Sequence, residues 1–238
     1  IPVPRGNLAA TSFTITRRNF SGDLEFIAKT LPEGVTMTAP KAPANFTSIP
    51  ILFSASADAP LNETLTKFDI VHRNTDKNTT ITGKYKHRVD LVYGPPNNRT
   101  YYEGIYDVLP VSVVEPVPFR VKLHEPATPI VRGGSLNLKV EVVRDANFTK
   151  DVLVKILTKP PGIGARTNIK ILGKDSIGYY PLTANGGTPL GEWDIGVQAE
   201  SVAEGGGNSL AASNFIKLKV EEPYLTMKIN LLMFLKVN

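Results

Sequence analysis

The stretch VVEPVPFRVKLHEPATPIVRGGSLNL, residues 113–138, decides the architecture of this 238-residue chain, because parts of it occur again at both ends. Its second part returns in residues 1–9, which read IPVPRGNLA. Its first part returns in residues 219–229, which read KVEEPYLTMKI. Internal similarity of this kind is the signature of repeated structural modules. We therefore expect the chain to start partway into one repeat and to reach the opening of another.

The segments between these stretches also occur twice. Residues 5–20, RGNLAATSFTITRRNF, match residues 132–148, RGGSLNLKVEVVRDANF. Residues 51–61, ILFSASADAPL, match residues 180–190, YPLTANGGTPL. In this alignment Phe20 corresponds to Phe148. The matches predict two copies of one fold.

The matched segments have the period of a β-strand. In residues 136–142, LNLKVEV, every second residue is Leu or Val, which gives a strand one apolar face. The 19 Pro and 19 Gly divide the chain into short segments, because proline removes a ladder donor and glycine allows turn conformations. We predict an all-β chain of two tandem immunoglobulin-like β-sandwich domains, residues 1–115 and 116–222, followed by an extended strand in residues 223–238. The first domain is expected to lack a counterpart of the strand predicted at Phe119–Leu123.

The net charge of +5 arises from residues spread along the chain, with one dense basic stretch at residues 84–88. On a strand, Lys84, Lys86 and Arg88 would share one face. This face is either solvated or a ridge for an acidic polysaccharide or another polyanion. No motif of a nucleic-acid-binding fold accompanies it, so no nucleic-acid partner is expected. No segment is predicted to span a membrane.

Residues that could carry chemistry are few. The chain has no cysteine, which excludes disulfides and thiolate metal sites. His72, His87 and His124 lack metal-ligand spacing, and no nucleophile elbow or phosphate loop occurs. The sequence from Asp145 to Asp151 has oxygen ligands at every second position but lacks the glycine and glutamate of a calcium loop, so a turn is the favoured interpretation. We expect no enzyme activity, no cofactor and no metal.

Three further features leave alternatives open. Trp193, the only tryptophan, either fills the second core or stacks on a sugar, for which the Tyr101-Tyr102 pair is another candidate. Six Asn-x-Ser/Thr sequons could carry glycans if the host glycosylates them. They begin at Asn19, Asn45, Asn62, Asn78, Asn98 and Asn147.

Residues 132–162 and 180–193, with PPGIG and YPLTANGG as their most specific parts, resemble the tandem Ig-like, pre-peptidase-associated modules of large secreted bacterial proteins. The first copy resembles a companion module close to the NEW3-type sandwiches appended to secreted enzymes. The resemblance covers most of both copies. It implies an extracellular or cell-surface β-sandwich array without catalytic residues.

The C-terminal segment, residues 225–238, continues the alternation. Its apolar positions are Leu225, Met227, Ile229, Leu231, Met233, Leu235 and Val237. The segment either packs locally or on a neighbouring domain of a longer array, or it is donated to the open edge of the next molecule's first sandwich. The predicted function is a structural module that self-associates, with a carbohydrate- or polyanion-binding module and a spacer of a larger secreted enzyme as alternatives.

Overall fold

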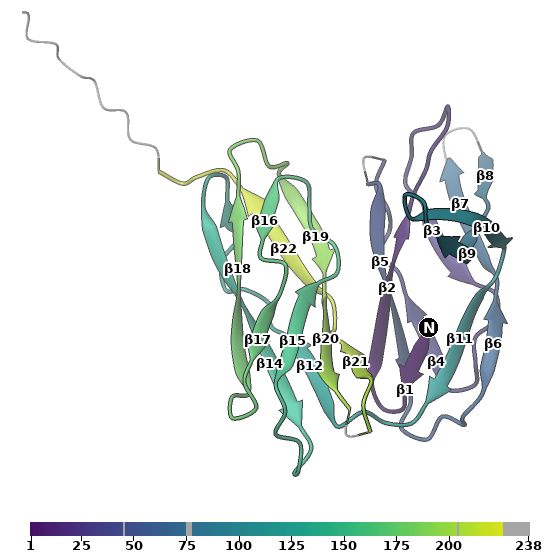
Figure 1. Cartoon of the computed structure of the whole chain (residues 1–238). Helices are drawn as coiled ribbons and strands as arrows, with labels where there is room; N and C mark the ends of the chain where they lie inside the picture. Colours follow the sequence, from purple (N-terminus) through teal and green to yellow (C-terminus); the bar gives the residue numbers. More distant parts are fainter. Residues whose placement is uncertain (45, 75–77, 204, 226–238) are drawn as a thin grey trace, which may run out of the picture.

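The computed structural model describes residues 1–44, 46–74, 78–203 and 205–225. These residues form twenty-two β-strands and no helix (Figure 1). Two separate hydrophobic cores occur, one built from residues of 3–113 and the other from residues of 119–220. The predicted all-β, immunoglobulin-like class is therefore confirmed. The boundary between residues 115 and 116 stays a prediction, and we refer below to residues 1–115 and 116–222 as the N-terminal and C-terminal halves.

The N-terminal half contains three small three-stranded sheets and one two-stranded hairpin. The first sheet has the order β2-β5-β4: Leu8–Thr14, Ser48–Ala55 and Val35–Thr38. The second has the order β1-β11-β6: Pro2–Pro4, Leu109–Val114 and Glu63–Thr66. The third has the order β3-β7-β8: Glu25–Ala28, Phe68–Asn74 and Thr79–Gly83. The hairpin joins β9 and β10: His87–Gly94 and Arg99–Tyr106.

The C-terminal half has three sheets. The first has the order β12-β14-β18-β16: Phe119–Leu123, Ser135–Arg144, Ile177–Ala184 and Ile163–Ala165. The second has the order β13-β22-β19: Ile130–Val131, Ile216–Glu221 and Gly191–Ile195. The third has the order β17-β15-β20-β21: Ile169–Ile171, Val152–Ile156, Val197–Val202 and Asn208–Ala212.

The strand pairings of the two halves correspond residue by residue. Leu8 lies opposite Ser54 in the β2–β5 pair, and Ser135 lies opposite Thr183 in the β14–β18 pair. The parallel pair of β1 with β11 corresponds in the same way to that of β13 with β22. The sequence repeat is thus a repeat of hydrogen-bonded topology.

One turn shows how closely the copies agree. Gly34 and Gly162 both have positive φ, 76° and 81°. An added Cβ would lie 2.7 Å from Ala59 Cβ in the first case and 2.6 Å from Thr188 Oγ1 in the second. Both turns therefore require glycine for the backbone conformation and for the close approach of the neighbouring loop.

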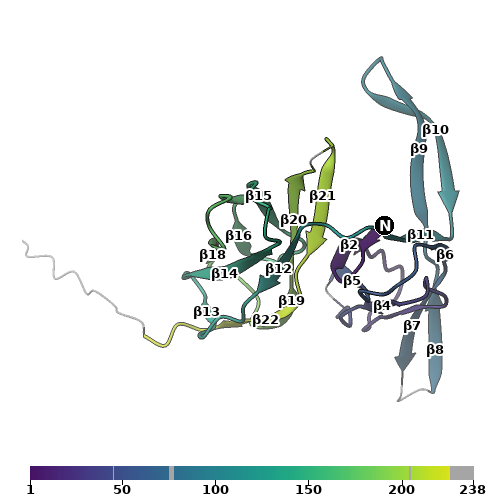
Figure 2. The same ribbon diagram turned by 90° about the horizontal axis from the view of Figure 1, so that it is seen from below.

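The halves differ in two places. β12 pairs with β14 along the edge of its sheet, whereas among the described residues β2, the counterpart of β14, pairs with β5 alone. In the N-terminal half the β9–β10 hairpin follows β8. In the C-terminal half β21, the counterpart of β8, leads directly to β22. Figure 2 shows this hairpin extending away from the rest of the half.

The two halves lie side by side (Figures 1 and 2). The buried Asn7 side chain donates to the carbonyl of Phe119 at 2.8 Å, and Arg120 Nε donates to the carbonyl of Gly6 at 3.0 Å. Phe46 packs against both cores. These contacts connect the start of β2 and the β4–β5 loop of one half to the other half.

Candidate interaction surfaces

The outer side of β2, away from β5, presents backbone groups without a strand partner among the described residues; we call it the open edge. Ile15 N donates to Thr47 O at 2.8 Å, and Asn7 O accepts from Ala55 N at 3.2 Å. Odd-numbered residues therefore direct their backbone groups toward β5. Because these groups alternate along an antiparallel strand, those of Ser12 and Thr14 point outward.

The open edge borders a groove, which we call the edge groove. It consists of two hollows with volumes of about 240 and 350 Å³. Residues 11–18 form one wall and residues 81–88 the other, and every lining residue belongs to the N-terminal half. Phe26 and Ile70 line both hollows. The groove thus combines unpaired backbone groups with apolar surface, the two features that a bound strand uses.

Tyr85 partly closes the N-terminal core on this side. Its ring centroid lies 5.2 Å from that of Phe13 and 5.0 Å from that of Phe68. Burial raises the pKa of Tyr85 to about 12. Tyr85 therefore covers part of the apolar surface formed by Phe13 and Phe68.

The basic stretch differs from its predicted form. Residues 84–86 connect β8 to β9 instead of lying within a strand, and Tyr85 packs against the core between two exposed lysines. Lys84, Lys86 and Arg88 are exposed on the rim of the edge groove. Arg88 forms ion pairs with Asp90, at 3.7 Å, and with Glu103. Its charge is therefore partly neutralised within the hairpin.

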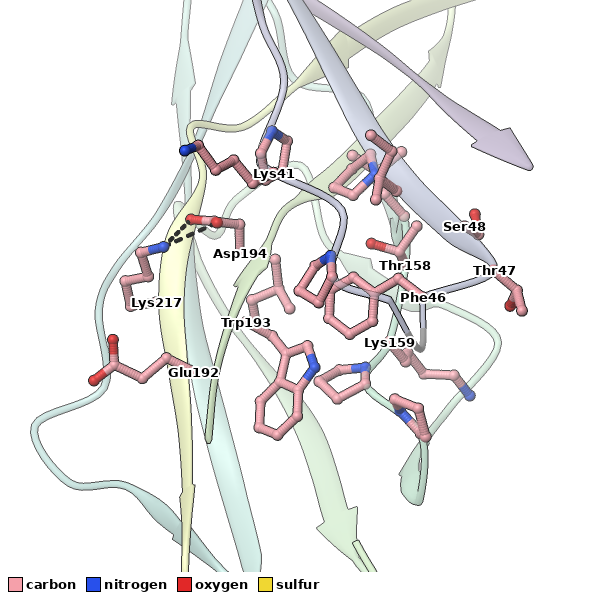
Figure 3. A pocket seen from close by; sticks show the side chains of 18 residues that line it. Lys41, Phe46, Thr47, Ser48, Thr158, Lys159, Glu192, Trp193, Asp194 and Lys217 are labelled. Atoms are coloured by element: carbon pink, nitrogen blue, oxygen red, sulfur yellow. Dashed lines mark hydrogen bonds and ion pairs between the residues drawn. The ribbon is translucent and has the colours of Figure 1, made fainter. Parts of the chain in front are cut away.

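A separate hollow, of about 500 Å³, lies between the halves (Figure 3). Its walls come from the β4–β5 loop, the β15–β16 connection and β19. Trp193 is only 6% exposed and belongs to the C-terminal core. Trp193 also lines this hollow (Figure 3). The core interpretation of Trp193 therefore holds, because an indole that is 6% exposed leaves little ring surface for a sugar to stack on.

Arg17 holds the loop that carries Phe46 into this hollow. Its guanidinium donates to the carbonyls of Phe46, Ala42 and Pro43 at 2.5, 3.0 and 2.9 Å. Desolvation lowers its pKa, and the Asp23 carboxylate partly offsets this shift. Sequence reasoning missed this arginine, although the repeat pairs it with Arg144.

Arg144 plays the corresponding role in the C-terminal half. It donates to the carbonyls of Lys150 at 2.6 Å and Leu172 at 3.0 Å, and it lies over the ring of Phe148. Desolvation lowers its pKa as well, which the carboxylates of Asp151 and Asp175 partly offset. The position common to both halves therefore stabilises the loops around it.

The β9–β10 hairpin exposes an unusual number of large apolar side chains. Tyr93 is 62% exposed and Tyr102 is 64% exposed. The other members of this surface are Leu91, Val92, Tyr101, Ile105 and Tyr106. Exposed apolar surface that gathers on one element marks an interaction site more often than scattered apolar residues do.

The remaining predicted residues lie apart from one another. Leu225 is 89% exposed, and the other six apolar positions of the C-terminal segment lie outside the described residues, as does Asn45. Asn62 is half-buried. The other four sequon asparagines are exposed, and the structure places them in loops or turns: Asn19, Asn78, Asn98 and Asn147.

Side chains that were considered as possible metal ligands have partners within the protein. In the Asp145–Asp151 turn, Asp151 accepts from Gly173 N at 2.9 Å and pairs with Lys170 at 3.4 Å. His124 pairs with Glu141 at 2.7 Å. The described part of the chain contains no group of three or more His, Cys, Asp or Glu that could hold a metal ion. No helix within the described ranges has the length and apolar character needed to cross a membrane.

Comparison with known proteins gave no match to a protein family and no match to a curated protein. Among solved structures, the chain is similar to domains 4–9 of the surface layer protein SbsC, at 17% identity and a TM-score of 0.31, over 96% of this chain and 31% of that one. It is also similar to the D00-D0 domain of Intimin, at 8% identity and a TM-score of 0.28, over 91% and 94% of the two chains. A third similarity is to fibronectin(III)-like modules of CbhA from Clostridium thermocellum, at 13% identity and a TM-score of 0.25, over 96% and 93%.

The chain thus spans about a third of the length of the SbsC structure. At these TM-scores the similarities carry no argument about function. The resemblance to NEW3-type modules stays a prediction.

Proposed function

We propose that this chain is a non-catalytic structural module of a bacterial extracellular or cell-surface assembly, and that it associates head to tail through its C-terminal segment. In this proposal residues 1–115 and 116–222 are two sandwich domains. Residues 223–238 form the strand that one molecule gives to the N-terminal half of the next.

The open edge of β2 is the observation that carries the proposal. The equivalent edge in the C-terminal half is covered by β12, and the same chain carries a segment with seven apolar residues at every second position from Leu225 to Val237. A strand added to an edge gains ladder hydrogen bonds, and its alternate side chains enter the pockets below. Because the donating and accepting surfaces differ, the contact repeats from molecule to molecule and produces a linear assembly.

The test compares the full chain with a chain that stops after Tyr224. We expect concentration-dependent oligomers of the full chain in sedimentation velocity, filaments or short chains in electron microscopy, and monomers of the shortened chain. Identical oligomer distributions for the two chains would contradict the proposal.

A pair of double substitutions sharpens this test without changing the chain length. Met227→Asp with Ile229→Asp places charges on the apolar face of the segment and should abolish association. Thr226→Asp with Lys228→Asp alters the other face and should leave most of the association intact, because only one face enters a core. Equal loss in both variants would point to a charge effect in place of strand donation.

The β9–β10 hairpin favours a second candidate function, carbohydrate binding. Tyrosine rings offer an apolar face and a hydroxyl group, which suits interfaces that are partly wet. Binding on a glycan array that is lost on Tyr102→Ala but kept on Phe46→Ala would support this candidate. Absence of binding by the unaltered protein would remove it.

A further inference from the structure

The C-terminal half shows what a strand at the edge of this fold contacts. β12 runs antiparallel to β14, with Phe119 opposite Arg144 and Leu123 opposite Val140. Phe119 is fully buried and stacks on Phe148 with 5.3 Å between ring centroids. His124, which follows the last residue of β12, donates its backbone N–H to Lys139 O at 3.0 Å. β12 therefore provides both ladder bonds and core side chains.

The repeat assigns a counterpart in the N-terminal half to each residue that β12 covers. Arg144 and Phe148 correspond to Arg17 and Phe20. Both arginines donate to matching carbonyls, those of Lys150 and Leu172 in one half and those of Gly22 and Pro43 in the other. Val142, with 1% of its surface exposed, corresponds to Ile15, which is half-buried. The apolar surface that β12 covers in one half is thus partly uncovered in the other.

Phe20 and β8 show the same difference. Phe20 lines the edge groove and packs against His72, with 4.9 Å between ring centroids. Its counterpart in the C-terminal half, Phe148, stacks on Phe119 instead. Ala211 of β21 is 1% exposed, whereas its counterpart Gly83 in β8 is exposed and lines the groove. The groove therefore occupies the position at which a strand equivalent to β12 would lie.

The C-terminal segment contains a sequence that matches β12. Aligning KVEEPYLTMKI with VVEPVPFRVKL places Leu225, Met227 and Ile229 at the positions of Phe119, Val121 and Leu123. Arg120 and Lys122 are exposed in β12. They correspond to Thr226 and Lys228 in this alignment. The segment thus keeps the inward apolar and outward polar pattern of β12.

We propose that residues 225–230 of one molecule bind antiparallel to the open edge of β2 in a second molecule, in the register that β12 has on β14. Leu225 then lies opposite Arg17, Met227 opposite Ile15 and Ile229 opposite Phe13. Leu225 packs against Phe20, as Phe119 packs against Phe148. This inference rests on the proposed function, and it adds the accepting residues and a single register to it.

The register agrees with the backbone directions of the accepting strand. Ser12 and Thr14 direct their backbone groups outward, as argued from the β2–β5 bonds. In the proposed register Ser12 O accepts from Asn230 N–H, which repeats the bond between Lys139 and His124. A slip of one residue would place Thr226 and Lys228 over the apolar floor of the groove, so the pattern disfavours it.

The positions of the two surfaces favour contact between molecules. The chain leaves β22 on the side of the C-terminal half that lies away from the N-terminal half (Figure 1). The edge groove is lined only by residues of the N-terminal half. A molecule that donates its C-terminal segment therefore keeps its own open edge available for the next one.

Engineered disulfides test the register, because the chain has no cysteine of its own. One full-length chain carries Thr14→Cys and a tag that changes its mobility, and a second full-length chain carries Lys228→Cys. Directly opposed residues of an antiparallel pair lie within disulfide distance. Matched controls place the accepting cysteine at Ser12 or Thr16, two residues to either side on the same exposed face.

We expect roughly tenfold more mixed disulfide with Thr14→Cys than with either control on a non-reducing gel, because diagonal neighbours lie too far apart for an unstrained bond. Equal yields at the three positions would overturn the single register. Absence of mixed disulfide in all three, while the oligomers still depend on residues 225–238, would place the acceptor elsewhere and leave the proposed function standing. Oligomers that survive removal of residues 225–238 would instead overturn the proposed function.

Discussion

The two halves of this molecule share their strand registers, their turns and their loop-holding arginines, and they differ at one edge and in one hairpin. The C-terminal half has β12 across the edge of β14, and the residues beneath it are almost completely buried. The N-terminal half leaves the corresponding edge of β2 unpaired among its described residues. The features that both halves share are therefore those that stabilise the fold. The open edge and the hairpin are the places where the halves can differ in the partners that they bind.

The largest expected difference concerns the phenylalanine that lies beneath the edge strand. Phe148→Ala removes a ring that is 9% exposed and stacked on Phe119, so we expect a loss of about 3–5 kcal/mol in the unfolding free energy of the C-terminal half. Phe20→Ala, at the matching position, should cost about 1–2 kcal/mol, because Phe20 is only half-buried and has less packing to lose. Urea unfolding followed by the fluorescence of Trp193, the only tryptophan, reports the first value. Hydrogen exchange of the N-terminal half reports the second.

Equal losses at the two positions would show that the edge of the N-terminal half is already as well covered as that of the C-terminal half. Addition of a peptide with the sequence of residues 224–238 should increase the cost of Phe20→Ala and leave that of Phe148→Ala unchanged. This control separates a missing partner from an intrinsically weaker site.

The glycine turns should instead behave alike. Gly34→Ala and Gly162→Ala both force an L-residue into positive φ and bring its Cβ within 3 Å of the neighbouring loop. Each should lower the unfolding free energy of its own half by roughly 1–3 kcal/mol. Tolerance of alanine at one position only would show that the two turns are not structurally equivalent, and denaturant unfolding of the two variants measures this.

Much of the fold could be predicted because it depends on local pattern and on repetition. The alternation in residues 136–142 predicts β14, and the match of residues 5–20 to residues 132–148 transfers that strand to β2. The repeat also predicts that the N-terminal half lacks a strand equivalent to Phe119–Leu123. The alternation is visible within a few neighbouring residues, and the repeat is visible when two segments are aligned, so both can be recognised from the sequence.

The remaining features depend on contacts between distant residues and leave no local signal. Alternation places Tyr85 on the face opposite its two neighbouring lysines, but only the nearby rings of Phe13 and Phe68 show that it joins the core. Arg17 donates to carbonyls more than twenty residues away, and any exposed arginine would look the same in the sequence. Phe46 contacts both cores, which no pattern within one half can indicate.

Alkaline pH offers a smaller test at the open side of the N-terminal core. Burial raises the pKa of Tyr85 from 10.0 to about 12, so between these values the unfolded chain loses a proton that the folded chain keeps. The stability associated with this neutral phenol is fully present below pH 10 and is lost as the pH rises to about 12. Tyr85→Phe should therefore weaken the decrease in stability between pH 10 and about pH 12, measured by urea unfolding with circular dichroism.

The C-terminal half provides the control for this measurement. Burial also raises the pKa of Tyr180, whose hydroxyl donates to the carbonyl of Arg166 at 2.6 Å. The unfolding reported by Trp193 should thus keep its alkaline dependence when Tyr85 is replaced. A Tyr85→Phe variant with an unchanged pH dependence in both signals would mean that Tyr85 is solvated in the folded protein.

The smallest effect is expected in the β9–β10 hairpin, which has no counterpart in the C-terminal half. The side chain of Arg88 is 64% exposed, and those of its partners Asp90 and Glu103 are 48% and 36% exposed. Ion pairs at such solvent-exposed positions contribute about 0.2–1 kcal/mol. Arg88→Ala should therefore change the unfolding free energy of the N-terminal half by no more than this and should leave the fluorescence transition of Trp193 unchanged. A larger loss, measured by hydrogen exchange, would mean that the hairpin supports the N-terminal core, and its exposed tyrosines would then be better explained by folding than by binding.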